Sequence, residues 1–399
     1  MNKKHTSQYK CPHAPRFTAI GVGIALLGLG QAAYAGPTIT HGEQGSLTIN
    51  YELQIWSQMR DYRSDAVAGD SYDTFLRRNR ITLMGQYNDY VGFYAQIEAG
   101  NDSKDGQDDR PTYYRDAYLT IDWSDALRVI AGRFKNTFSR ENLEACLEPL
   151  TLDRSLISYT PFGGSRDTGV ALWGNLADAS LQYRLMVADG REGSDNIPED
   201  NPRYTARIHY SAFDPEYAYG YRGTYLGSQH VLTIGAAYDY QANAVYANLP
   251  GREDPRDYSA WTVDLFYEQP TAFGTFTFSS AYFEYSVDDT LTEDPIVADT
   301  SVPANAELEA YYVKAGYLLP GKVGSGRLQI FARHDSSDYI RNDDYFDNDL
   351  NAAGFNYYFN GQQVKLTFEY ADVQYDENHP TVKSLQDYKQ ATVGLQMIF

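Results

Sequence analysis

Basic side chains recur at alternate positions in several stretches of this sequence, as in Arg78 with Arg80 and Arg133 with Lys135. A guanidinium group is a planar fork that holds phosphate or carboxylate oxygens through paired hydrogen bonds. Asp116 and Asp122 lie an even number of residues apart, so on a β-strand they would share one face. If the basic and the acidic side chains line opposite walls of a channel, they create a transverse electric field, which orients polar solutes and draws anions along the basic side.

Sequence motifs for catalysis or metal binding are not found. The chain has no Gly-x-Ser-x-Gly elbow, no His-Glu-x-x-His pair and no Cys-x-x-Cys-His sequence for haem attachment, and its seven histidines are scattered. We therefore predict no enzyme, no cofactor and no metal site. The net charge of −20 also argues against a nucleic-acid partner, because a negative surface repels phosphates.

The elements that carry these charges are predicted to be β-strands, because apolar and polar residues alternate along most of the chain. Residues 47–55 and 391–399 are clear examples, each with one apolar and one polar face. The pattern predicts sixteen strands, at 46–56, 76–87, 90–99, 113–122, 126–135, 167–174, 180–187, 203–210, 230–240, 258–267, 274–284, 309–318, 326–334, 349–359, 362–371 and 388–399. Most are long enough for a tilted strand to cross hydrocarbon, which takes about nine to eleven residues.

An even number of such strands predicts an all-β fold, a sixteen-stranded antiparallel transmembrane barrel over residues 36–399. Closure leaves no unpaired backbone edge in lipid. Residues 1–35 are typical of a secretory signal peptide, with a basic start, an apolar run at 17–29 and Ala33-Tyr34-Ala35 as cleavage site. Cys146 is then the single cysteine of the exported chain, so no disulfide framework is expected.

Connections between the predicted strands alternate between long and short, as in outer-membrane barrels with external loops and periplasmic turns. The long ones are 57–75, 100–112, 136–166, 188–202, 241–257, 285–308, 335–348 and 372–387, and together they carry a charge of −23. The connection 211–229 is the exception, because it is long where the pattern predicts a periplasmic turn.

The polar strand faces should line the lumen, where rings of charge select ions by sign. The predicted inward cations are Arg78, Arg80, Arg133, Lys135, Arg184, Arg207, Arg327, Arg333 and Lys365; the inward acids are Glu52, Glu98, Asp116, Asp122, Asp264 and Glu369. We place the constriction at Arg133 and Lys135, with Arg78, Arg80 and the loop residue Arg140, facing Asp116 and Asp122. The alternative is that these cations pair with acids across the lumen and select nothing.

Several motifs resemble those of a known family. Residues 75–80 read Phe-Leu-Arg-Arg-Asn-Arg, residues 114–119 Tyr-Arg-Asp-Ala-Tyr-Leu, residues 132–141 Gly-Arg-Phe-Lys-Asn-Thr-Phe-Ser-Arg-Glu, residues 153–156 Asp-Arg-Ser-Leu, and residues 351–359 contain Gly-Phe-Asn-Tyr-Tyr. They resemble segments of the phosphate-selective porin O and P family, with Thr137 where that family commonly has Pro and Asp153 where it has Glu. The resemblance implies a usually trimeric diffusion channel in a Gram-negative outer membrane. It also implies that the third long loop, 136–166, folds into a lumen lined by Arg and Lys.

Two functions fit this sequence. One is a water-filled porin for small hydrophilic solutes, including anions such as phosphate. The other is a structural sleeve around a partner such as a multihaem cytochrome. We favour the porin, because a sixteen-stranded lumen that retains a loop is narrow for a folded cytochrome.

Overall fold

The computed structural model describes residues 36–62, 69–99, 111–162, 164–192, 197–248, 251–287, 306–339, 346–379, 382 and 385–399. The predicted signal peptide, residues 1–35, lies outside these ranges. No helix among the described residues is long and apolar enough to cross a membrane.

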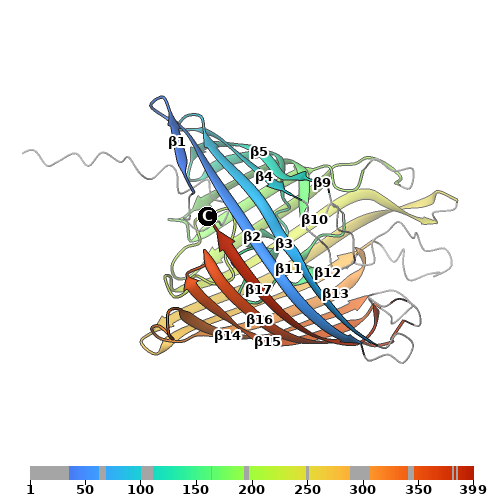
Figure 1. The fold of residues 1–399 in the computed structure, drawn as a ribbon. Coiled ribbons are helices and arrows are strands. Elements are labelled where there is room, and N and C mark those ends of the chain that lie inside the picture. Colours follow the sequence, from blue (N-terminus) through green and yellow to red (C-terminus); the bar gives the residue numbers. More distant parts are fainter. Residues whose placement is uncertain are drawn as a thin grey trace, which may run out of the picture.

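Within the described residues, seventeen antiparallel strands form one sheet. Sixteen of them make the barrel wall: β2 (Gly45–Tyr62), β3 (Gly69–Gln86), β4 (Val91–Glu98), β5 (Tyr113–Ser124), β6 (Leu127–Lys135), β7 (Arg166–Leu176), β8 (Leu181–Ala188), β9 (Arg203–Ser211), β10 (Val231–Asn248), β11 (Glu253–Thr271), β12 (Gly274–Ser286), β13 (Leu308–Leu318), β14 (Arg327–Tyr339), β15 (Asn348–Asn360), β16 (Val364–Tyr375) and β17 (Tyr388–Ile398). The other strand, β1 (Thr38–His41), pairs with the start of β2. The strands run obliquely around the wall, with β1 and the C-terminus at one end (Figure 1).

The barrel closes where its last strand pairs with β2. This pairing begins with Tyr388 opposite Tyr62, and it ends where Phe399 and Tyr51 exchange two backbone hydrogen bonds of 2.8 and 2.9 Å. β1 pairs with the part of β2 that lies beyond the end of β17. The sixteen-stranded closed barrel is therefore confirmed, with no open strand edge at the seam.

Each predicted strand coincides with or overlaps one of the strands β2 to β17. Four strands, β2, β3, β10 and β11, are much longer than predicted, so the expected loops 57–75 and 241–257 are largely paired strand. Two neighbouring strands that leave the membrane together continue to satisfy each other's backbone groups. The four-residue strand β1 was not predicted, because it is too short to show an alternating pattern.

Side chains alternate between the outer and inner faces of the wall. On the last strand and at its end, Leu395, Met397 and Phe399 are exposed on the outer face, as predicted, while Gln396 is buried inside. An apolar exterior around a polar interior is the arrangement that lipid requires of a barrel.

Apolar packing also occurs inside the barrel. One cluster joins Phe134 and Trp173 of the wall to Leu143 and Tyr221, which belong to connections between strands. A second cluster joins Phe138 to aromatic side chains of the inner wall, such as Tyr285. Part of the lumen is therefore filled by segments that fold in from its ends.

Candidate functional site in the barrel lumen

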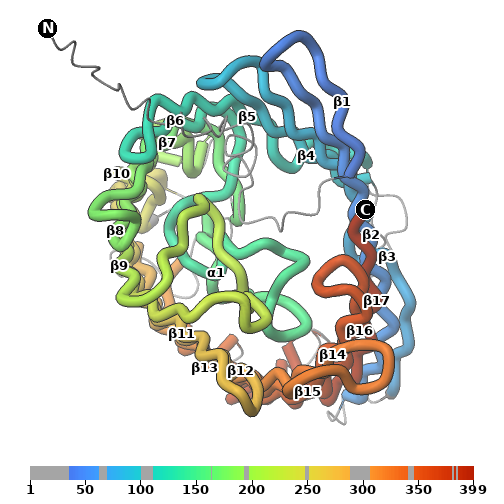
Figure 2. Tube along the Cα trace, turned by 90° about the vertical axis from the view of Figure 1, so that its left-hand side faces the viewer, coloured from blue at the N-terminus to red at the C-terminus, as the bar shows by residue number. Residues whose placement is uncertain are grey.

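Residues 136–165, which connect β6 to β7, fold into the barrel as predicted; we call them the lumenal loop. The loop contains the short helix α1 (Arg140–Leu143), which Ser139 caps by accepting a 3.0 Å hydrogen bond from Asn142 N, and a 3-10 turn at Leu156–Ser158. Figure 2 shows α1 inside the ring of strands. Most of the described loop residues are buried, because the wall surrounds them.

The lumenal loop is bonded to the wall opposite its origin. Asn356 Nδ2 on β15 donates to the carbonyl oxygen of Leu150 at 2.8 Å. Lys365 Nζ on β16 and Gln396 Nε2 on β17 donate to the carbonyl oxygen of Leu147, at 3.0 and 2.9 Å. The loop thus spans the lumen from β6 to β15–β17 and narrows the channel.

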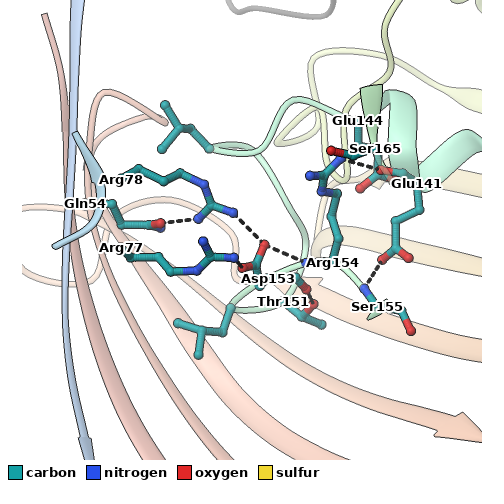
Figure 3. Close-up of polar contacts among 12 residues, drawn as sticks. Gln54, Arg77, Arg78, Glu141, Glu144, Thr151, Asp153, Arg154, Ser155 and Ser165 are labelled. Atoms are coloured by element: carbon teal, nitrogen blue, oxygen red, sulfur yellow. Dashed lines mark hydrogen bonds and ion pairs between the residues drawn. The ribbon is translucent and has the colours of Figure 1, made fainter. Parts of the chain in front are cut away.

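Two consecutive arginines of β3 hold the loop at Asp153 (Figure 3). Arg78 Nη2 donates to Asp153 Oδ1 at 2.8 Å, and Arg77 Nη2 donates to Oδ2 at 2.6 Å. Consecutive residues of a regular strand face opposite sides of the sheet. Here the β2–β3 register shifts after Gln54, so that Arg77 is skipped. This β-bulge turns both guanidinium groups into the lumen.

A second bulge has the same effect on β5. The β4–β5 register shifts after Gln96 and skips Arg115. Arg115 Nη1 donates to Glu98 Oε2 at 3.1 Å, and Arg80 Nε donates to the same oxygen at 2.6 Å. The two bulges therefore add Arg77 and Arg115 to Arg78 and Arg80, so that two arginines meet each of the carboxylates Asp153 and Glu98. We call Arg77, Arg78, Arg80 and Arg115 the arginine cluster.

The charges around Asp153 keep it ionised. Burial would raise the pKa of this carboxyl group, but Arg78, Arg77 and Arg154 more than offset burial and hold the pKa well below its usual range. Further cations nearby bond to neutral carbonyl groups: Arg154 Nη1 donates to the oxygen of Asn142 at 2.7 Å, and Lys135 Nζ to that of Leu143 at 3.3 Å. Cations thus outnumber carboxylates among the described residues of this region.

Ten of the eleven residues that we predicted to line the channel lie inside the barrel. Their side chains contact the lumenal loop, the connection between β9 and β10 or other side chains on the inner face of the wall. They are Arg78, Arg80, Lys135, Arg140, Arg184, Arg207, Arg333, Lys365, Asp116 and Asp122. Arg327, also predicted inward, donates to the carbonyl oxygen of Leu226 at 3.0 Å.

The predicted position of Arg133 inside the barrel is wrong. Arg133 is exposed and lies opposite Ala117, on the outer face of the wall. Its neighbour Phe134 points inward and belongs to the same buried cluster as Leu143 of the lumenal loop. We assumed that apolar residues face lipid. At β6, however, the lumenal loop presents apolar side chains such as Leu143 to the inner face of the wall. Phe134 therefore points inward and Arg133 points outward, the reverse of the predicted orientation.

Many inward cations have a specific acidic or carbonyl partner. Ion pairs join Arg140 to Glu216 at 2.7 Å, Arg166 to Asp116 at 3.1 Å, Arg207 to Asp264 at 2.7 Å and Arg333 to Asp335 at 3.1 Å. Glu98 and Asp116 are thus paired, as the alternative expected, but with Arg80, Arg115 and Arg166 of nearby strands rather than across the lumen. Glu369 instead accepts a 3.2 Å hydrogen bond from Leu152 N. Arg166 offsets the charge of Asp116, and Arg128 lies 3.9 Å from Asp122. The acidic wall that we expected is therefore weaker than predicted.

The residues predicted to face the lumen did not include several charged side chains that lie there, namely Arg77, Arg115, Arg154, Arg166, Arg203 and Lys314. For two of them the sequence held a signal. Arg77-Arg78 and Arg115-Asp116 are adjacent charged pairs on otherwise alternating strands. Such pairs indicate a bulge, because burying either charge in lipid is costly.

Comparisons with known proteins agree with this architecture. The chain is similar to the crystal structure of the outer membrane channel DcaP of Acinetobacter baumannii, with a TM-score of 0.55, 14% identity, and coverage of 92% of this chain and 100% of that one. It is also similar to the anion-selective porin from Comamonas acidovorans, with a TM-score of 0.57, 11% identity, and coverage of 89% and 100%. An uncharacterized protein of Aquifex aeolicus (strain VF5) is 20% identical over 83% of this chain and 82% of its own length.

The family assignment rests on sequence. The phosphate-selective porin O and P family matches residues 49–399, which include the whole wall from β3 onward and the lumenal loop. The chain therefore belongs to the phosphate-selective porin O and P family and is a channel-forming porin of the Gram-negative outer membrane.

Proposed function

We propose that this porin conducts small anions in preference to cations, and that the arginine cluster sets the preference. The observation that carries the proposal is the pair of β-bulges, which bring Arg77 and Arg115 into the lumen beside Arg78 and Arg80. An excess of fixed positive charge at a narrow point raises the local concentration of anions and lowers that of cations.

The acidic external connections oppose this preference only weakly. Without the lumenal loop, the seven other long connections carry a charge of −22, and at physiological salt such exposed charge is screened over about 8 Å. The arginine cluster acts at the loop that narrows the lumen, where a permeating ion passes close to it. The narrow region therefore dominates selectivity.

A double substitution tests this proposal. Replacing both Arg77 and Arg115 by Gln removes two positive charges while keeping side chains that can donate hydrogen bonds. At about 1 kcal/mol per charge in a water-like medium at 4 Å, each removal should lower the permeability of an anion about fivefold and raise that of a cation about fivefold, so the anion-to-cation permeability ratio should fall by about 30-fold. The measurement is the reversal potential of single channels in a salt gradient.

Arg133→Gln is the matched control, because Arg133 is exposed on the outer face. It should leave the reversal potential unchanged. If the double variant forms channels with wild-type selectivity, the arginine cluster does not set the preference.

We further propose phosphate among the permeant anions and a homotrimer as the assembly. Guanidinium forks suit oxyanions with several acceptor oxygens, so added phosphate should reduce the chloride current in the wild type more than in the double variant. Chemical crosslinking in the native membrane tests the trimer. We propose no catalytic role, and the sleeve around a cytochrome has no support, since the lumenal loop occupies the space a folded partner would need.

A further inference from the structure

The connection between β9 and β10, residues 212–230, also folds into the barrel; we call it the inner segment. It enters from the end that carries β1 and the C-terminus, which the short turns identify as periplasmic. Its backbone pairs with that of the lumenal loop: Ala145 N donates to the oxygen of Tyr221 at 2.9 Å, and Tyr221 N donates to that of Leu143 at 3.3 Å. Figure 2 shows the two segments side by side within the ring.

A buried ion pair adds to this contact. Arg140 Nη1 and Nη2 donate to the two carboxylate oxygens of Glu216, each at 2.7 Å, and both side chains are almost completely buried. Arg222 Nε lies 3.1 Å from Glu148 Oε2, a second ionic contact between the same two segments. A bidentate arginine–carboxylate pair fixes both position and orientation of the groups it joins.

The inner segment is bonded just as firmly to the wall. The hydroxyl group of Tyr221 accepts hydrogen bonds from Arg184 Nη1 at 2.6 Å and Arg207 Nε at 3.2 Å, and lies 2.6 Å from His209 Nδ1. Glu268 of β11 accepts a 2.8 Å hydrogen bond from Gly227 N. The inner segment therefore joins β8, β9 and β11 to the lumenal loop.

The two sides of the lumenal loop differ in their access to water. On the side of the inner segment, Tyr221 and the wall residues Tyr285 and Tyr312 have no exposed surface. Across the loop, the side chain of Arg115 is 18% exposed and that of Asp153 is 15% exposed. The first side is a packed interior around these three tyrosines, with Arg222 of the inner segment as an exception at 30% exposure, and the second contains charged groups that reach water.

We propose that the inner segment is a second constriction element, which closes the β7–β13 side of the lumen and positions the lumenal loop through the Arg140–Glu216 pair. Permeating solutes are thereby confined to the side lined by β3 and β5. This inference concerns where the channel runs. It holds for either sign of permeant ion, so it does not depend on the anion preference proposed above.

The substitution Glu216→Gln tests this proposal, because it removes the ion pair that joins the inner segment to the lumenal loop. The variant leaves Arg140 buried without a charged partner, and loss of one partner from a buried pair is strongly unfavourable. Two readouts follow. Single-channel conductance should rise as the closed side opens. Cys146, 6% exposed beside the Ala145–Tyr221 hydrogen bond, should react at least about tenfold faster with a membrane-impermeant thiol reagent.

Two further variants separate positioning from general damage. Glu216→Asp retains the charge and should return both readouts toward the wild type. Glu309→Gln makes the same chemical change on the outer face, where Glu309 is exposed, and should change neither. Should Glu216→Gln fail to fold, Arg222→Gln weakens the second ionic contact and should shift both readouts in the same direction. Wild-type conductance and labelling in either folded variant, or equal changes in Glu309→Gln, would overturn the proposal.

Discussion

Asp153→Asn should release the part of the lumenal loop that faces β3. In the wild type, Asp153 accepts hydrogen bonds from Arg78 at 2.8 Å, from Arg77 at 2.6 Å and from the backbone of Arg154 at 2.9 Å. Asparagine has nearly the same shape but no charge, and its amide group presents donors to guanidinium groups that are themselves donors. The substitution therefore removes the attraction without creating a cavity.

The magnitude follows from the burial of the partners. Removing one member of a fully buried ion pair costs about 3–5 kcal/mol. The side chains of Asp153 and Arg77 are 15% and 30% exposed, so solvent screens part of their interaction, whereas that of Arg78 is only 1% exposed. We therefore expect a smaller cost, about 2–3 kcal/mol, which corresponds to a roughly 30- to 150-fold larger population of the detached segment.

Hydrogen–deuterium exchange of the barrel in detergent or lipid measures this population directly, because exchange of a buried amide requires local opening. Amides at 151–155 should lose protection by the stated factor while the strands keep theirs. Asp122→Asn is the matched control, because it makes the same chemical change at a carboxylate that lies beside Arg128 and does not contact Arg77 or Arg78. Unchanged protection at 151–155 in Asp153→Asn would refute our account of how the loop is held.

Two further predictions concern the outer face and pH. Leu395→Arg places a charge on the exposed outer face and should destabilise the barrel by about 2–4 kcal/mol in urea unfolding from vesicles if the site lies near the midplane; an unchanged midpoint would contradict the register. Burial would raise the pKa of Glu216, but Arg140 more than offsets burial and lowers it to about 2. Because this pKa is depressed, the stabilisation is complete above the ordinary carboxyl pKa of about 4.3 and is lost as pH falls through about 2. Conductance should stay constant from pH 7 to 5; a rise there that Glu216→Gln abolishes would contradict this assignment.

The barrel wall could be predicted from sequence because the constraint on it is simple. Lipid outside and charge inside impose a period of two on each strand, and Leu395, Met397 and Phe399 follow it. The same rule failed for Arg133, because β6 faces an apolar part of the lumenal loop and Phe134 turns inward to meet it. A single strand's sequence does not reveal what folds against its inner face.

The candidate site was less predictable, because it depends on local irregularities and distant contacts. Arg77 and Arg115 enter the lumen through bulges, and a bulge shifts the alternation by one residue without any change in composition. The Arg140–Glu216 pair joins residues 76 positions apart. The unusual length of the connection 211–229 was the one visible sign of the inner segment, but length alone does not say where a connection folds.

The reversal potential of the wild-type channel in a tenfold potassium chloride gradient tests the central claim most directly. Permeation past a narrow region in which cations outnumber carboxylates predicts a potential displaced toward the chloride equilibrium value. A potential displaced toward the potassium equilibrium value would contradict the claim. It would mean that the acidic external connections, which carry a charge of −22 without the lumenal loop, control which ions pass.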